Sequence, residues 1–60
     1  MEAYQQFVGK SVKVVMKIEN KIIFYFGTVT GVQDQTILLN TDNNRKILLK
    51  KCDISQIIEH

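Results

Sequence analysis

Basic residues stand in two adjacent pairs late in the chain, Arg45-Lys46 and Lys50-Lys51. The apolar run at residues 47–49 separates them, so a strand over this segment carries one pair at each end. Such pairs can neutralise phosphates and release counterions, which gives salt-dependent binding to nucleic acid. The same charges are typical of a solvated sheet edge, where lysine discourages pairing with another chain. Both interpretations remain open from this pattern alone.

Catalysis is not indicated by any arrangement of side chains in this sequence. His60 is the only histidine, and it stands at the last position, where we expect the chain to be frayed rather than to hold a general base. The carboxylates are scattered among predicted turns and ends, with none paired for acid–base work. Because Cys52 is the only cysteine, an internal disulfide or a multi-cysteine metal site is excluded. We expect no enzyme, no cofactor, no metal and no small-molecule substrate.

Composition indicates one small globular domain. The chain has 60 residues, of which 45% are hydrophobic and 23% charged, and its net charge of +2 permits a polyanionic partner without requiring one. No apolar run approaches the ~20 residues of a membrane span. The first residues also lack the basic patch and apolar stretch of a signal peptide. We therefore expect a cytoplasmic protein without a membrane partner, in which Cys52 is a small buried or half-buried residue.

The segment at residues 22–32 is the strongest predicted strand, because it is rich in β-branched and aromatic residues. With a period of two, Ile22, Phe24 and Phe26 share one face, and Ile23 and Tyr25 share the other. Both faces are apolar, which predicts a strand that is covered on both sides. Tyr25 could stack on a base if exposed, but we expect it to be packed or at a subunit contact.

Gly27 interrupts this strand and predicts a bend or a close approach to another backbone. A short helix is expected at residues 2–8, ended by Gly9, and strands are expected at residues 11–18, 36–40, 45–51 and 57–58. The expected connections are a turn at residues 19–20 with Asn20 at positive φ, a turn at 41–44 and a one-turn connector at 53–56.

Together these elements predict an all-β fold, a five-stranded small barrel with a short N-terminal helix. The single domain spans residues 1–60, with a capping helix at 1–9 and the barrel at 11–58. Three of the strands carry consecutive apolar residues, whereas a barrel interior accepts only one parity from each strand. Apolar side chains on the other face of these strands must be buried by the N-terminal helix or by another copy of the chain.

Two segments carry a resemblance to a known family. One is Gly27 followed ten positions later by the Ile-Leu-Leu strand at residues 37–39, after an acidic-Gln turn. The other is the segment at residues 51–57, which matches a K-H-A-I-S-T-I pattern at Lys51, Ile54, Ser55 and Ile57. In this order the segments resemble the Sm-like fold, and especially the bacterial Sm-like RNA chaperones of the Hfq family. An SH3-like barrel is the alternative.

The resemblance implies a homo-oligomeric ring that binds single-stranded RNA. By position it places Lys51, and Gln33 or Asp34 in the turn, at the nucleotide, and the Arg-Gly pair of other Sm proteins falls on Lys50 and Lys51. Cys52 stands where the family has a histidine, and Gln35 stands where it has a stacking aromatic. The predicted RNA site consists of six residues: Gln33, Asp34, Arg45, Lys46, Lys50 and Lys51. The alternative function is a structural or protein-interaction barrel with no nucleic-acid role.

Overall fold

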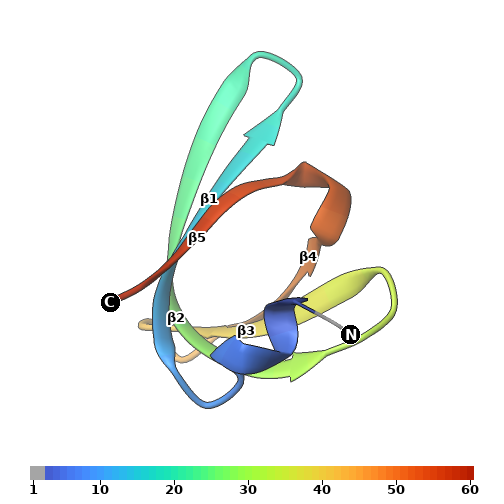
Figure 1. The fold of residues 1–60 in the computed structure, drawn as a ribbon. Helices are drawn as coiled ribbons and strands as arrows, with labels where there is room; N and C mark the ends of the chain where they lie inside the picture. The colour runs from blue at the N-terminus through green and yellow to red at the C-terminus, as the bar shows by residue number, and fades with distance from the viewer. Residues whose placement is uncertain (1–2) are drawn as a thin grey trace.

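A computed structural model describes residues 3–60 of the chain. In this range five antiparallel strands form one sheet in the order β4-β3-β2-β1-β5 (Figure 1), which confirms the all-β class. The elements are the 3-10 helix η1 (Ala3–Phe7), β1 (Ser11–Ile18), β2 (Lys21–Val32), β3 (Thr36–Thr41), β4 (Lys46–Lys50), the 3-10 turn η2 (Lys51–Asp53) and β5 (Ile54–Glu59). Neither of these short helices, the only ones within residues 3–60, has the length and apolar character needed to cross a bilayer.

Strand β2 belongs to both halves of the sheet. Its first part, residues 21–28, pairs with β1, and its second part, from Gly27 to Val32, pairs with β3. The two ladders overlap at Gly27 and Thr28, where β2 curves and the sheet wraps round on itself (Figure 1). Strands β4 and β5 are the two ends of the sheet and do not pair with each other, so the sheet is not closed.

At Gly27 the backbone of β3 leaves no room for a side chain on β2. A Cβ at this position would meet the carbonyl oxygen of Asn40, and it would lie 2.8 Å from Cα of Thr41 and 2.9 Å from the carbonyl carbon of Asn40. These are backbone atoms, which cannot rotate away as the end of a side chain can. The predicted close approach at Gly27 is thus confirmed, and it is lack of space, not backbone conformation, that requires glycine.

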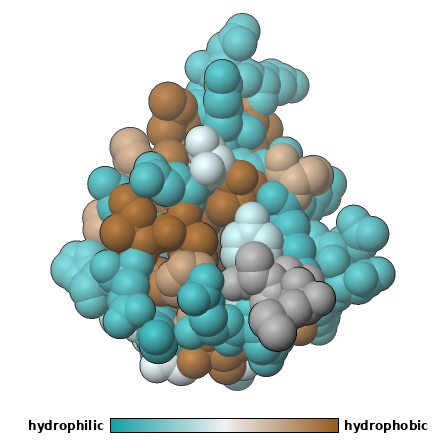
Figure 2. Space-filling model, viewed as in Figure 1, coloured by the Kyte–Doolittle hydropathy of each residue, from teal (hydrophilic) through white to brown (hydrophobic). Residues whose placement is uncertain are grey.

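The core lies on the concave side of the wrapped sheet. It consists of alternate residues from four strands: Val12, Val14, Met16, Val29, Ile37, Leu39 and Leu49. The alternation predicted for the first strand is confirmed as far as Met16, whereas Ile18 is exposed. The core is small. Figure 2 shows that apolar residues also lie on the surface, among mostly hydrophilic residues.

Within a single chain β2 is not covered on both faces, so the N-terminal helix does not provide the expected cover. Ile22, Phe24 and Phe26 are 60%, 54% and 42% exposed. The N-terminal segment lies instead along the second half of the strand, where the backbone of Val29 bonds to Gly9 and Lys10 at 2.7 and 3.2 Å. The hairpin of β1 and β2 therefore projects beyond the part of the sheet that this segment covers.

The chain ends of the fold also differ from expectation. The short helix expected at residues 2–8 is a 3-10 helix at residues 3–7, and Glu2 lies outside the described residues. Gly9, at φ +84°, ends the turn as predicted. The connector is η2, not residues 53–56, and the fifth strand is Ile54–Glu59 rather than 57–58. A register shift opposite Val15 and Met16 leaves Ser55 as an extra residue. This bulge lets Ile54 and Ile57 both pack against the core despite their spacing.

The turns lie within one residue of their predicted places, with Thr41 in β3 and Arg45 outside β4, but one backbone conformation differs from the prediction. In the turn between β1 and β2 the residue with positive φ is Glu19, at 58°, and Asn20 is not in this region. In the turn between β3 and β4 Asn44 has φ of 63°, a conformation that asparagine tolerates better than most residues.

The close approach at Gly27 yields a test of the wrapped sheet. We expect Gly27→Ala to lower the free energy of unfolding by more than the ~1 kcal/mol typical of a point mutant, because a methyl group displaces the backbone of β3. Gly31→Ala is the matched control, since its Cβ would meet only Leu38 Cβ, at 3.9 Å. That change should stay within about 1 kcal/mol of the wild type. Urea melts measure both, and equal stability of the two variants would contradict the close packing at Gly27.

Candidate nucleic-acid interface

The turn between β2 and β3 meets the start of η2 at one corner of the fold. The backbone N–H of Lys51 donates to the carbonyl oxygen of Gln35 at 3.0 Å, which extends the pairing of Thr36 with Lys50. Within the turn, the Thr36 hydroxyl donates to Gln33 Oε1 at 3.1 Å and Gln33 N–H donates to the carbonyl oxygen of Thr36 at 2.8 Å. The fold thereby brings together four of the six predicted site residues, which with Gln35 form what we call the lysine corner: Gln33, Asp34, Gln35, Lys50 and Lys51.

An aromatic residue from η1 joins the lysine corner. The ammonium of Lys51 lies 5.7 Å from the centroid of the Tyr4 ring, within the range of a cation–π interaction. Tyr4 is half-buried and packs against the core, so it holds the Lys51 side chain in place. Reasoning from sequence missed Tyr4 as a site residue. In the sequence, Tyr4 shares an apolar face with Phe7 and Val8. This pattern predicts that the N-terminal helix packs against the rest of the fold, but it does not show against which residues.

The lysine corner is not strongly positive. Lys50 is exposed and Lys51 half-buried, but Asp34 stands in the turn and Asp53 ends η2. Two carboxylates and two ammonium groups give these segments no net formal charge, and salt screens the field of exposed charges beyond about one Debye length, ~8 Å at physiological salt. This corner alone therefore offers a few phosphate contacts rather than a strong anion site.

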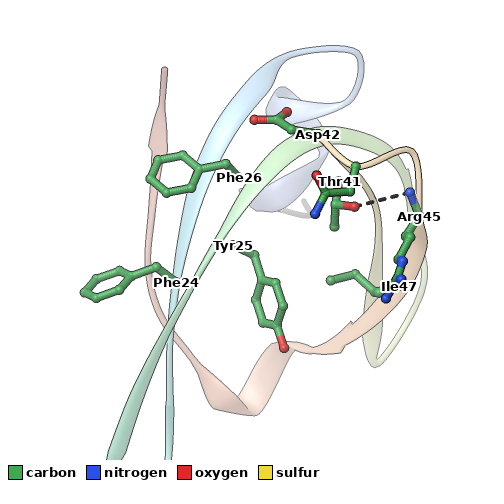
Figure 3. Close-up of a pocket in the computed structure, with 8 residues that line it drawn as sticks. Phe24, Tyr25, Phe26, Thr41, Asp42, Arg45 and Ile47 are labelled. Carbon is green, nitrogen blue, oxygen red and sulfur yellow. Dashed lines mark hydrogen bonds between the residues drawn. The ribbon is translucent and has the colours of Figure 1, made fainter.

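Arg45 and Lys46 do not join the lysine corner. They lie at the opposite end of β4 from Lys50, and four residue steps of ~3.3 Å separate Lys46 from Lys50 by about 13 Å. Arg45 belongs to the turn after β3, where its N–H donates to the Thr41 hydroxyl at 3.2 Å (Figure 3). It lines a hollow of about 500 Å³ with Tyr25 and Ile47. The predicted RNA site is thus divided between two ends of one strand.

A second group of side chains, which sequence reasoning missed, lies on the convex side of the sheet. Figure 3 shows Phe24 and Phe26 projecting on one side of β2, with Tyr25 on the other side. The Lys13 ammonium, on the neighbouring β1, lies 4.8 Å from the Phe24 centroid and 5.9 Å from that of Phe26. The Phe26 ring also meets His60 edge-to-face at 5.8 Å. We call Lys13, Phe24, Phe26, Ile58 and His60 the outer face.

Tyr25 is half-buried and packed against the core, as expected. The alternation of β2 already separated Tyr25 from Phe24 and Phe26. The sequence could not show which parity faces the core, since both are apolar and the covering segment is remote in sequence. Near this face Lys10 and Glu59 form an ion pair at 3.3 Å, which is about half exposed and contributes little stability.

No protein-family model, curated protein or solved structure matches this chain.

The position of Cys52 provides a chemical test of the exposed placement of η2. Cys52 is exposed, contrary to expectation, because η2 runs on the surface between two ends of the sheet. We expect its thiol to react fully with a disulfide reagent in the native protein, at a rate within about tenfold of that in denaturant, because reactivity follows access. Ellman titration with and without urea measures this. A thiol that reacts only after unfolding would contradict the exposed placement of η2.

Proposed function

We propose that this protein is an Sm-like RNA-binding module that assembles as a homo-oligomer and binds single-stranded RNA at the lysine corner. The observation that carries the proposal is the contact of Lys51 with Gln35, which sets the Gln-rich turn against the paired lysines. That is the combination of segments which the Sm-like resemblance implies at the nucleotide. The all-β sheet with its strongly curved second strand is in keeping with the proposed fold.

Each side chain of the lysine corner has a defined chemical capacity. The exposed Lys50 ammonium is suited to a phosphate, as a strongly hydrated point charge. The side-chain amides of Gln33 and Gln35 offer donors and acceptors to a base edge. Lys51 is held over Tyr4 and adds charge at a fixed position. With so few contacts per chain, affinity depends on repetition of the corner in an oligomer, where a second contact becomes effectively intramolecular.

Two unpaired sheet edges support assembly of several copies. Strands β4 and β5 each have one side without a partner within residues 3–60. Exposed edges of this kind favour pairing with another chain, and a closed ring removes them all. We propose that β4 of one copy pairs with β5 of the next.

The second candidate function is a protein-interaction barrel of the SH3-like type without a nucleic-acid role. One observation favours it: Leu48, at the centre of the β4 edge, is 60% exposed. An extended peptide could add to this edge through its backbone and cover Leu48 with a side chain. Binding of RNA and the state of assembly distinguish the two functions.

The first test is salt-dependent RNA binding. We expect uridine-rich and adenine-rich oligonucleotides to bind with similar affinity at low salt, because the corner makes mainly phosphate contacts. The logarithm of affinity should fall by about 0.7 per log unit of salt for each phosphate neutralised. Lys50→Ala with Lys51→Ala should flatten this slope, as filter binding at several salt concentrations can measure.

Arg45→Ala with Lys46→Ala provides the matched control. It removes the same formal charge from the other end of β4, so a general loss of positive charge would affect both double variants alike. An equal change of slope in the two would contradict the assignment to the lysine corner. Absence of binding by the wild type at low salt would leave the protein-interaction barrel as the better function.

The second test concerns assembly. We expect multi-angle light scattering to give a multiple of the 6.9 kDa chain mass at tens of micromolar protein. Leu48→Lys should shift the distribution toward the monomer, since it places a charge in the proposed contact while leaving the core intact. Ile22→Lys, at an equally exposed residue away from both edges, is the control. A monomeric wild type would count against the ring.

A further inference from the structure

The first half of β2 has a free edge, on the side opposite to β1. Strand β1 pairs with the first half of β2, whereas β3 pairs only with its second half. The carbonyl oxygen of Phe26 accepts a hydrogen bond from the Asp42 N–H at 3.2 Å, so the backbone groups of Phe26 point away from β1. Backbone groups alternate in direction along a strand, so those of Ile22 and Phe24 point the same way. Within residues 3–60 no strand pairs with them there.

This edge lacks the features that protect exposed strands from pairing. Natural edges carry charged side chains or proline, which discourage the addition of another chain. Residues 22–26 contain neither. Their exposed side chains are apolar instead, with Ile22 60% and Phe24 54% exposed. The edge is distinct from those of β4 and β5, so it stays open in the proposed assembly.

The two faces of this edge differ, which restricts the segment that fits it. Figure 3 shows the rings of Phe24 and Phe26 on one side of β2 and Tyr25 on the other. Tyr25 lines the hollow of about 500 Å³ with Ile47 and Arg45. Successive residues of an added strand point to opposite faces of the sheet. One residue of that strand therefore enters the hollow, where Tyr25 and Ile47 favour an apolar side chain, and its neighbours lie beside the exposed rings.

The charges beside the rings select an acidic segment. The Lys13 ammonium lies 4.8 Å from the Phe24 centroid, and among residues 3–60 it contacts rings and no carboxylate. Lys17 lies further along the same face of β1. Glu59, on β5, is already paired with Lys10 at 3.3 Å. A carboxylate on the added strand, placed beside Phe24, can therefore reach the Lys13 ammonium.

Two other occupants fit this edge less well. Nucleic acid lacks the alternating N–H and C=O groups that extend a sheet. A second copy of the chain that pairs through the same edge brings no carboxylate to Lys13, because residues 20–33 contain no acidic side chain. An extended protein segment in which apolar and acidic residues alternate has both the backbone and the charge.

We propose that the first half of β2 binds an extended acidic segment of a partner protein, which adds to the sheet antiparallel to β2 and places a carboxylate at Lys13. Addition of a strand to an exposed edge is a recurring mode of peptide recognition. The inference goes beyond RNA binding and uses none of the residues of the lysine corner. It also differs from addition of a peptide to β4, which covers Leu48. One module thereby joins a protein partner and RNA through separate surfaces.

Hydrogen exchange at single backbone amides tests the added strand. The probe is a synthetic peptide of alternating valine and glutamate with the length of an ordinary strand, about six residues. The amides of Ile22 and Phe24 should exchange quickly in the free protein and about tenfold more slowly when the peptide is bound. The amides of Ile23 and Tyr25 point toward β1, so they should be protected in both states and serve as the internal control.

Three results of this experiment would overturn the proposal. One is slow exchange of Ile22 and Phe24 in the free protein, because the edge is then not free. Another is protection of the Leu48 amide in their place, which puts the peptide on β4. The third is absence of binding at about 1 mM peptide, a concentration at which even a Kd of that size gives half saturation.

A matched peptide and matched variants test the charge. A peptide with lysine in place of glutamate should bind about tenfold more weakly, because like charges then meet at Lys13. Lys13→Ala should weaken binding of the glutamate peptide about threefold, as expected for an exposed ion pair. Lys50→Ala with Lys51→Ala removes more charge, but at the lysine corner, and should leave binding unchanged. A larger loss in that double variant than in Lys13→Ala would show general charge attraction instead.

Two substitutions at Ile22 separate the backbone from the side chain. Ile22→Ala and Ile22→Pro both remove the isoleucine, but only proline removes the N–H that points to the added strand. The proline variant should bind the peptide about fivefold more weakly than the alanine variant, the effect of one hydrogen bond. Urea melts show whether both variants fold, and equal binding by two folded variants would contradict the added strand. The exchange experiment needs no variant.

The outcomes for this edge are independent of those for the lysine corner. Peptide binding with protection of Ile22 and Phe24, but no binding of oligonucleotide at low salt, would overturn the proposed function and support this inference. Salt-dependent RNA binding without protection of these two amides by the peptide would do the reverse.

Discussion

The close approach of two backbones at Gly27 is the constraint on which the rest of the structure depends. At this residue β2 pairs on one side with Val12 of β1 and on the other with Thr41 of β3. A side chain here would push β3 away from β2, because Asn40 and Thr41 would meet it with main-chain atoms. One residue without a Cβ therefore allows a single long strand to serve two ladders, and the sheet to wrap around seven buried side chains.

The positions of both candidate surfaces follow from this shared strand. The second half of β2 leads into the turn that meets Lys51, which creates the lysine corner. The first half runs out with β1 into a hairpin, beyond the N-terminal segment that lies against Val29. Phe24 and Phe26 are exposed for this reason. The concave side of the sheet thus serves packing, while its convex side is available for contacts.

Much of the fold could be predicted from the sequence. The all-β class, the bounds of β1, the special role of Gly27 and the end of η1 at Gly9 all follow from local patterns. Prediction failed where a pattern had two solutions. The parity of β2 was ambiguous because both faces are apolar, and the start of β5 was hidden by a bulge at Ser55 that breaks the period of two. The separation of the two basic pairs was predictable, because an extended strand over the apolar run at residues 47–49 places Lys46 and Lys50 at its opposite ends.

The pairing of β5 with β1 has a consequence for folding kinetics. The pairs β1–β2, β2–β3 and β3–β4 are hairpins between neighbours in the chain, whereas β5 reaches β1 only across three intervening strands. Contacts of such long sequence separation form late, because the entropy of loop closure opposes them until the hairpins are in place. As an edge strand at the end of the described chain, β5 is also an element that local opening can release. When it detaches, the edge of β1 beside the core is bared, and the species most prone to aggregation is then nearly native rather than unfolded.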